Sequence, residues 1–233
     1  METQHEPHFL GILIFMGALA LLSGCADQTP HPYQVAVPGH ASHLMNGQTY
    51  VYECSGGYRF TAWIEDDNAW LFLPDQTVHF LPPVVSGSGA KYSDGVLTFW
   101  NKGDEALLDA RGKSHHACRN NPAKAIWEGA RLRGIDFRAV GNEPGWHLEI
   151  MEGERIVLVT DYGETRYEFN APEPKVDRLT AITTYQVSNG EPELIIRLKD
   201  QLCHDSMSGE AFETTVIVSL DGKQYRGCGR HLN

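Results

Sequence analysis

Short segments in which apolar and polar residues alternate, separated by polar turns, recur along most of the chain after residue 46. In residues 58–65, for example, Phe60, Ala62 and Ile64 fall on one face of a strand and the residues between them on the other. Such a succession is typical of antiparallel barrels and sandwiches. The strand candidates are 49–54, 58–65, 69–73, 77–81, 96–100, 105–109, 115–119, 137–140, 146–150, 155–160, 165–169, 181–188, 193–198, 214–220 and 223–226.

One helix is expected between two β-rich parts. Asn121 can cap it, Pro122 suits its first position, and Gly134 can end it. Apolar residues recur at helical spacing at Ala123, Ile126, Trp127 and Ala130. We therefore predict an all-β protein with two small antiparallel barrel or sandwich domains, at 46–120 and 135–233, joined by a helix at 121–134.

The chain begins with a segment typical of export. The apolar run at residues 9–22 is short for a membrane span and long enough for a signal-peptide core. It ends in Leu22-Ser23-Gly24-Cys25, which resembles the lipobox of bacterial lipoproteins. The resemblance implies a signal peptide at 1–24 and a lipid such as palmitate on Cys25. Ala26, where an aspartate would suggest inner-membrane retention, favours an outer-membrane anchor facing the periplasm.

After the export segment we expect a flexible tether and then two disulfide bonds. Residues 25–45 are polar and rich in Pro, Gly and His, which indicates a flexible tether. An oxidising compartment favours pairing of the remaining cysteines. Three pairings are possible, and locality favours Cys54–Cys118 and Cys203–Cys228. No CxxC pair is present, and we expect no metal and no cofactor.

A run of small residues, Ser86-Gly87-Ser88-Gly89-Ala90, has no bulk to bury. Gly87 and Gly89 would allow positive φ and a thin loop. The turn signal Ser93-Asp94-Gly95 follows, then a strand, then a second turn at Asn101-Lys102-Gly103. The hydroxyl loop and the turn lysine are thus expected at opposite ends of one hairpin-like segment.

This ordered set resembles the signature of the membrane-bound inhibitors of c-type lysozyme. In that family a Ser-Gly loop precedes a basic residue and a tyrosine, here Lys91 and Tyr92. The pattern Phe-Trp-x-Lys-Gly-x-Glu-Ala-x-Leu then matches residues 99–108. The resemblance spans about residues 45–120 and implies a β-barrel whose loop enters the sugar-binding cleft of lysozyme. By motif position it sets Ser88 and Lys102 against the catalytic acids, in a lysozyme-binding segment that also includes Gly87, Gly89, Lys91, Tyr92 and Gly103.

The roles implied for Ser88 and Lys102 also make chemical sense without the resemblance. Glycosidases work with a pair of carboxylates, one of which must protonate the leaving group. An ammonium beside them lowers their pKa and occupies the place of the substrate. A serine hydroxyl can donate a charge-assisted hydrogen bond to a carboxylate. The competing interpretation is a flexible turn with Lys102 as a solvated surface charge.

The second half resembles a domain of bacterial envelope proteins without an assigned activity, through residues 141–146, 203–209 and 225–229. This resemblance implies a fold and no function. His204, Asp205 and Ser206 are adjacent, whereas a catalytic triad needs residues that converge in space. The Gly-Asn-Glu-Pro segment at 141–144 is interpreted as a turn whose Asn and Glu satisfy local backbone groups. We predict that the chain is not an enzyme, and a hydrolase in this half is the weakest alternative.

The formal net charge is −11, and neither half carries a basic stripe. Nucleic-acid binding is therefore disfavoured. An acidic body suits a basic protein partner, because opposite fields raise the association rate, and c-type lysozymes are generally basic. The alternative function is a structural or ligand-binding lipoprotein of the bacterial cell envelope whose C-terminal domain carries the activity.

Overall fold

The structure is a computed structural model that describes residues 47–187 and 192–233. The predicted signal peptide, Cys25 and the predicted tether lie outside these residues, as does the last residue of the strand predicted at 181–188. The described part of the chain contains no helix of the length and apolar character that a membrane span requires.

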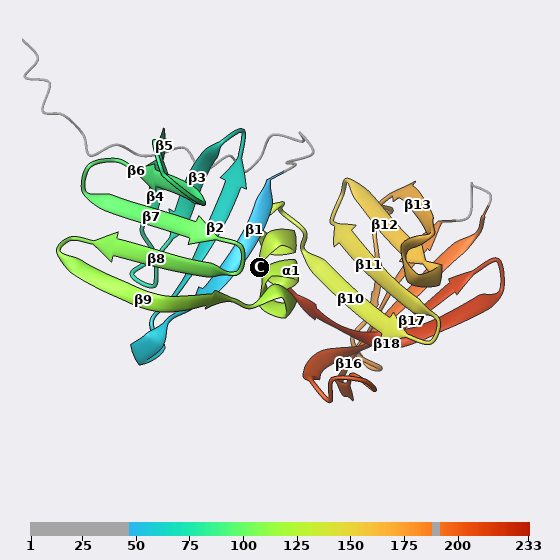
Figure 1. The fold of residues 1–233 in the computed structure, drawn as a ribbon. Helices are drawn as coiled ribbons and strands as arrows, with labels where there is room; N and C mark the ends of the chain where they lie inside the picture. Colours follow the sequence, from blue (N-terminus) through green and yellow to red (C-terminus); the bar gives the residue numbers. More distant parts are fainter. Residues whose placement is uncertain (1–46, 188–191) are drawn as a thin grey trace, which may run out of the picture. The chain divides into compact units, whose positions relative to one another are not determined.

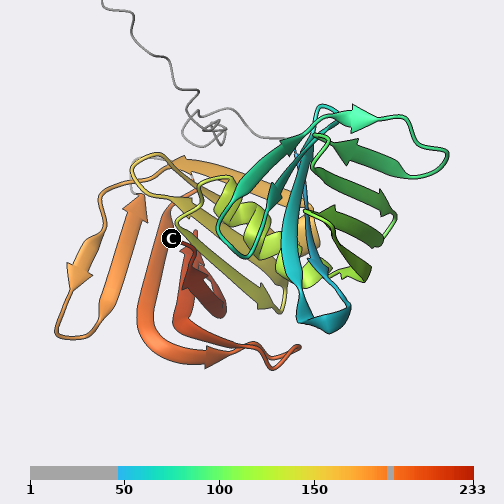
Figure 2. The same cartoon turned by 90° about the vertical axis from the view of Figure 1, so that its left-hand side faces the viewer.

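The first sheet has nine antiparallel strands in the order β4-β3-β2-β1-β9-β8-β7-β6-β5. It curls round nearly into a barrel (Figures 1 and 2). Its strands are β1 (Gln48–Glu53), β2 (Arg59–Glu65), β3 (Asn68–Phe72), β4 (Val78–Leu81), β5 (Pro83–Val84), β6 (Ala90–Ser93), β7 (Leu97–Lys102), β8 (Glu105–Ala110) and β9 (Lys113–Asn120), with a 3-10 turn, η1 (Ser55–Gly57), after β1.

The second sheet also has nine antiparallel strands, in the order β13-β12-β11-β10-β18-β17-β16-β15-β14. It forms a half-barrel (Figure 1). Its strands are β10 (Phe137–Asn142), β11 (Gly145–Met151), β12 (Arg155–Thr160), β13 (Thr165–Asn170), β14 (Lys175–Asp177), β15 (Ile182–Val187), β16 (Leu194–His204), β17 (Ala211–Leu220) and β18 (Lys223–His231), with a 3-10 turn, η2 (Asp161–Gly163), after β12. The predicted all-β class is confirmed, and strand by strand the second sheet repeats the order of the first.

Each sheet buries one face of its strands around an apolar core of its own. In the first sheet the centre of the core is aromatic: the rings of Tyr52 and Phe60 lie 5.2 Å apart, and those of Tyr52 and Phe99 lie 5.6 Å apart. Both Tyr52 and Phe99 are fully buried. Burial of such large side chains is the main stabilising term for a small sheet, at roughly 1.5–3 kcal/mol each.

Two disulfides join the cysteine pairs that locality favoured, Cys54–Cys118 and Cys203–Cys228. The first bridge continues the pairing of β1 with β9, which runs through Tyr52↔Asn120 and Glu53↔Arg119. β1 and β9, which come first and last along the chain in this sheet, are neighbours within it. They are therefore linked by hydrogen bonds and by a disulfide next to them. The unpaired edges of the sheet are β4 and β5.

The predicted helix is present as α1 (Pro122–Leu132), but its buried face differs from the prediction. The Asn121 side chain accepts a hydrogen bond from the Lys124 backbone N–H at 3.2 Å, as the capping prediction requires. The buried residues are Ala125, Gly129 and Ala130, whereas Ile126 is 53% exposed. The reason is close packing on β1: a Cβ at Gly129 would lie 3.0 Å from Thr49 Oγ1. Small residues thus decide which face is buried.

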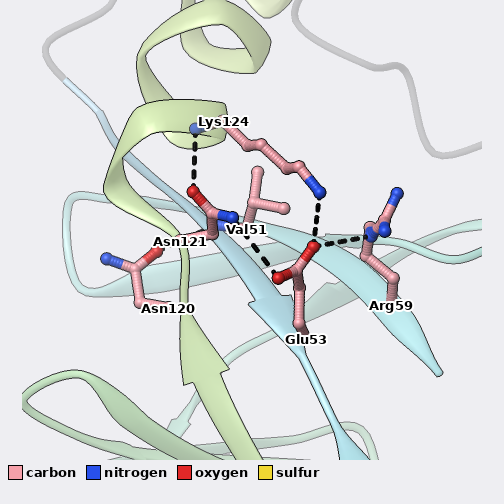
Figure 3. Close-up of polar contacts among 6 residues, drawn as sticks. All are labelled: Val51, Glu53, Arg59, Asn120, Asn121 and Lys124. Carbon is pink, nitrogen blue, oxygen red and sulfur yellow. Dashed lines mark hydrogen bonds and ion pairs between the residues drawn. The ribbon is translucent and has the colours of Figure 1, made fainter. Parts of the chain in front are cut away.

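Polar contacts fix the start of α1 to β1 (Figure 3). The Glu53 carboxylate accepts hydrogen bonds from Lys124 Nζ at 2.6 Å and from Asn121 Nδ2 at 3.3 Å, and Arg59 Nε lies 3.2 Å from it. The bonds from Lys124 and then Asn121 hold the pKa of Glu53 below its usual value. The backbone of Val51 bonds to Asn120 and Asn121 on either side. The helix therefore begins at a defined place on the first sheet.

Several strand bounds differ from the predictions. The short strands β5, β6 and β14 were not predicted, and β16, β17 and β18 are longer than expected. β5 contains Pro83 and has only two residues, so it carries no alternating pattern to recognise. It lies at the sheet edge, where a proline is tolerated.

Candidate functional site

The loop of small residues and Lys102 lie at the same end of one hairpin. Strands β6 and β7 pair through Ala90↔Asn101 and Ser93↔Thr98, so the chain reverses at Asp94-Gly95. Residues 86–89 precede Ala90, and Lys102 follows Asn101. The loop and Lys102 do lie at opposite ends of this segment along the sequence. The prediction that they lie at opposite ends of the hairpin is wrong, because the antiparallel register brings the two together.

Hydrogen bonds give the loop a defined shape. Ser86 Oγ donates to the Ser88 carbonyl oxygen at 2.7 Å and accepts from the Ser88 backbone N–H at 3.4 Å. Trp100 Nε1 also donates to the Ser88 carbonyl oxygen, at 2.7 Å. The Ser88 residue itself is exposed. The loop therefore presents a serine from a backbone held at two points, unlike a flexible turn.

Gly89 is required by the close approach of the loop to β7. Its φ is +66°, and a Cβ there would lie 2.4 Å from the Asn101 carbonyl oxygen and 3.1 Å from Lys102 Cβ. Any side chain would push the loop away from β7. Gly89 adopts the positive φ that the sequence allows at both glycines, whereas Gly87 is not among the glycines with positive φ.

The ammonium of Lys102 has no ion-pair partner within residues 47–187 and 192–233, and neither has that of Lys91. Glu105 is the cross-strand partner of Lys102 around the turn that contains Gly103, where φ is +59°. Its carboxylate is instead bonded to Arg119 Nη2 at 2.8 Å. Arg119 thus engages the acid nearest to Lys102 in register, and Lys102 keeps its charge available.

Tyr92 lies beneath this site rather than in it. It is 5% exposed and its ring stacks on Phe99 at 5.7 Å. Burial raises the pKa of Tyr92, and also that of Tyr52, above the usual tyrosine value. Any contribution of Tyr92 to binding is therefore indirect, through support of β6.

Sequence reasoning gave no specific role to Ser86, Trp100 or Arg119. Trp100 lies between the buried residues Phe99 and Asn101 and is 38% exposed. Strict alternation places it on the outer face of β7, which was a usable signal. The contacts of Ser86 and Arg119 depend on loop shape and on the neighbouring strand, and no pattern within β7 reveals them.

The second sheet does not repeat this site. There the strand after the corresponding loop, β15, begins at Ile182, which pairs with Lys199. The next residue is Asp200, an acid at the register position that corresponds to Lys102. The loop itself, residues 178–181, contains no glycine. The two sheets share a strand order and differ in the chemistry at this end.

The conspicuous motifs of the second half do converge. Asn142 Nδ2 donates to the Asp205 carboxylate at 2.7 Å and to Ser206 Oγ at 3.0 Å. Asn142 was predicted to satisfy local backbone groups, and its side-chain amide instead bonds to side chains 63 and 64 residues away. The side chain of Asp205 also accepts from the backbone of Met207 and Ser208, which shapes the turn between β16 and β17. These bonds engage the Asn142 amide and the Asp205 carboxylate, and no group of three or more potential metal ligands occurs in the described ranges.

Residues 52–116 match the family described as membrane-bound lysozyme inhibitor of c-type lysozyme. Three curated proteins with that name are similar to the chain. The one from Yersinia enterocolitica is 31% identical over 106 residues, which are 44% of this chain and 76% of that protein. The chain belongs to this family of lysozyme inhibitors.

Two further relatives support the same placement. The inhibitor from Pseudomonas aeruginosa is 34% identical over 85 residues, which are 35% of this chain and 65% of that protein. The inhibitor from Escherichia coli is 43% identical over 42 residues, which are 18% of this chain and 38% of that protein. The chain thus spans just under two thirds of the Pseudomonas inhibitor. No solved structure matches it significantly.

The family accounts for part of the chain. Its members are inhibitors rather than enzymes, which agrees with the prediction that this chain is not an enzyme. The family match ends at residue 116. The resemblance of residues 135–233 to a domain of bacterial envelope proteins stays a prediction, as do the predicted domain limits.

The bond from Trp100 to the loop leads to a first test. Trp100→Phe removes the indole N–H and keeps the ring, so the Ser88 carbonyl oxygen loses one of its two donors. We expect amide hydrogen exchange at Ser88 and Gly89 to become about threefold to tenfold faster, the equivalent of one ordinary hydrogen bond. Trp70→Phe is the control, because the Trp70 ring packs at a tilt against Phe80 of β4 and makes no hydrogen bond to a loop within residues 47–187 and 192–233. Unchanged exchange at Ser88 would show that the bond does not hold the loop.

Proposed function

We propose that this protein inhibits c-type lysozyme by inserting the Ser88 loop into the active-site cleft and placing the Lys102 ammonium against the catalytic carboxylates. The observation that carries the proposal is the convergence, at one end of a hairpin, of an exposed serine and a lysine that has no ion pair among the described residues. The names of the three similar proteins support the choice of target.

The proposed mechanism uses two kinds of interaction. A lysine ammonium between two carboxylates stabilises their charged forms and so lowers their pKa, which removes the proton that glycoside cleavage needs. The Ser88 hydroxyl donates to one carboxylate, with about 1.5–3 kcal/mol for a charge-assisted hydrogen bond. Because the loop is held by Ser86 and Trp100 before binding, little conformational entropy is lost when the complex forms.

The location of the protein is part of the same proposal. The similar proteins are named membrane-bound, and the chain carries Cys25 in a lipobox-like segment. We propose a lipid anchor on Cys25 that holds the protein at the outer membrane, facing the periplasm. There it would meet lysozyme before the enzyme reaches the cell wall.

The direct test is an assay of c-type lysozyme on bacterial cell walls. Purified residues 26–233 should inhibit, and the double variant Ser88→Ala with Lys102→Ala should not. The matched control is Lys113→Ala with Ser114→Ala, which removes the same two residue types from exposed positions at the start of β9. Absence of inhibition by the unchanged protein, with both disulfides intact, would overturn the proposed function.

A further inference from the structure

Three of the five exposed large apolar side chains in the described part of the first sheet lie beside the Ser88 loop. Among the described residues of this sheet, the large apolar side chains with substantial exposure are Phe80, Val84, Val85, Val96 and Trp100. Val85 directly precedes the loop and is fully exposed, at 101%. Val84 and Trp100 are 39% and 38% exposed. We call Val84, Val85 and Trp100 the apolar collar.

Register places two members of the collar on one continuous face. Val84 pairs with Lys91, and Lys91 pairs with Trp100, across β5, β6 and β7. Directly paired residues point to the same side of a sheet, with Cβ atoms about 4.5–5.5 Å apart. The neighbouring pair, Tyr92 and Phe99, is buried in the core. Val84, Lys91 and Trp100 therefore share the outer face, and Trp100 links that face to the loop through Ser88.

The loop residues 86–89 and Lys102, which we call the tip, are too small to form a stable interface by themselves. A specific protein complex buries roughly 800 Å² on each partner, whereas the tip consists of four small residues and one lysine. Interfaces commonly combine an apolar or aromatic centre with a polar rim, and tryptophan is enriched among the residues that contribute most. The collar supplies such a surface in direct continuity with the tip.

We infer that the apolar collar is the hydrophobic part of the lysozyme interface and contacts the enzyme surface that borders its catalytic cleft. The inference rests on the proposed function. Charge complementarity selects this occupant, because two lysines lie among or beside the collar residues. Lys91 lies between Val84 and Trp100 in register, and Lys102 lies two residues after Trp100 on the same face of β7. Neither lysine has an ion pair among the described residues. That charge suits a cleft lined with carboxylates. The lysines orient the encounter, and the collar slows dissociation once water is excluded.

The chain offers a matched pair of variants for a test. Val85→Ser removes apolar surface beside the loop, and Val96→Ser removes it at the reversal of the same hairpin, where Val96 is 64% exposed. With the purified protein and a c-type lysozyme, we expect Val85→Ser to weaken inhibition about tenfold, through a faster dissociation rate, since a valine side chain leaves water on binding. We expect Val96→Ser to inhibit like the unchanged protein.

The outcomes separate the collar from the proposed function. Equal inhibition by Val85→Ser and the unchanged protein, or equal weakening by Val85→Ser and Val96→Ser, would overturn the collar and leave lysozyme inhibition standing. No inhibition by the unchanged protein would overturn the proposed function itself. A dimer of the unchanged protein that Val85→Ser dissociates in analytical ultracentrifugation would assign the collar to a second copy of this chain and overturn the inference.

Discussion

Substitution of Lys102 by methionine should weaken inhibition of c-type lysozyme by about 30-fold to 1000-fold, the cost of truncating one partner of a buried charge pair. The variant keeps the apolar length of the side chain and removes only the ammonium. Because Lys102 has no ion pair among the described residues and Glu105 is held by Arg119, the folded protein loses no internal contact of that charge. Its melting temperature should therefore stay the same.

The measurement is the inhibition constant in a cell-wall lysis assay, with thermal unfolding alongside. Lys113→Met is the matched control, because Lys113 is an exposed lysine at the start of β9 and should not affect inhibition. Lys102→Arg separates charge from shape: a guanidinium keeps the charge and changes the geometry of the hydrogen bonds. If Lys102→Met inhibits as strongly as the unchanged protein, the lysine mechanism is wrong even where the protein still binds.

The local parts of this site are readable in the sequence because a hairpin is a local structure. Asp94-Gly95 between two strand-like segments predicts a reversal, and Gly95 has φ of +89°. Asp94 Oδ1 accepts from the backbone N–H groups of Val96 and Leu97, as its turn signal indicates. Had β6 been recognised as a strand, the proximity of Ser88 and Lys102 would have followed from antiparallel register alone.

Contacts between distant segments were not readable in the same way. Asn142 lies 63 residues from Asp205, and their hydrogen bond depends on the order of strands in the second sheet. The buried face of α1 was missed for a related reason. Periodicity favoured the larger residue Ile126, whereas close packing on Thr49 selected Gly129. A local sequence pattern indicates which residues favour burial or a turn. The residues that they contact in the folded chain determine which of them are buried and which groups they bond.

The glutamate at position 149 should prove indispensable for the stability of the second sheet. Its Oε1 accepts a hydrogen bond from Arg133 Nη2 at 2.8 Å and another from Arg138 Nη1. The side chains of Arg138 and Glu149 are only 8% and 12% exposed. Glu149→Gln keeps the volume and leaves the Arg138 guanidinium buried without a counter-charge. We expect a loss of about 3–5 kcal/mol in the free energy of unfolding, measured by urea denaturation.

A surface glutamate provides the control. Glu168 also lies between two arginines, Arg155 at 3.9 Å and Arg166 at 3.4 Å, but its side chain is 52% exposed. Exposed ion pairs contribute little, so Glu168→Gln should cost no more than about 1 kcal/mol. Equal effects of the two substitutions would show that burial of Arg138 is not what makes Glu149 important.

The same pair predicts how stability responds to acid. Burial raises the pKa of Glu149, but Arg133 and Arg138 together outweigh it and hold that pKa below its usual value. A carboxyl with a lowered pKa in the folded state contributes stability above its unfolded pKa of about 4.3, and that contribution is lost as the pH falls through the folded value. The stability difference between the unchanged protein and Glu149→Gln should therefore be largest near pH 7 and shrink below pH of about 4. A difference that stays constant from pH 7 to 3 would mean that the charge of Glu149 is not the source of its contribution.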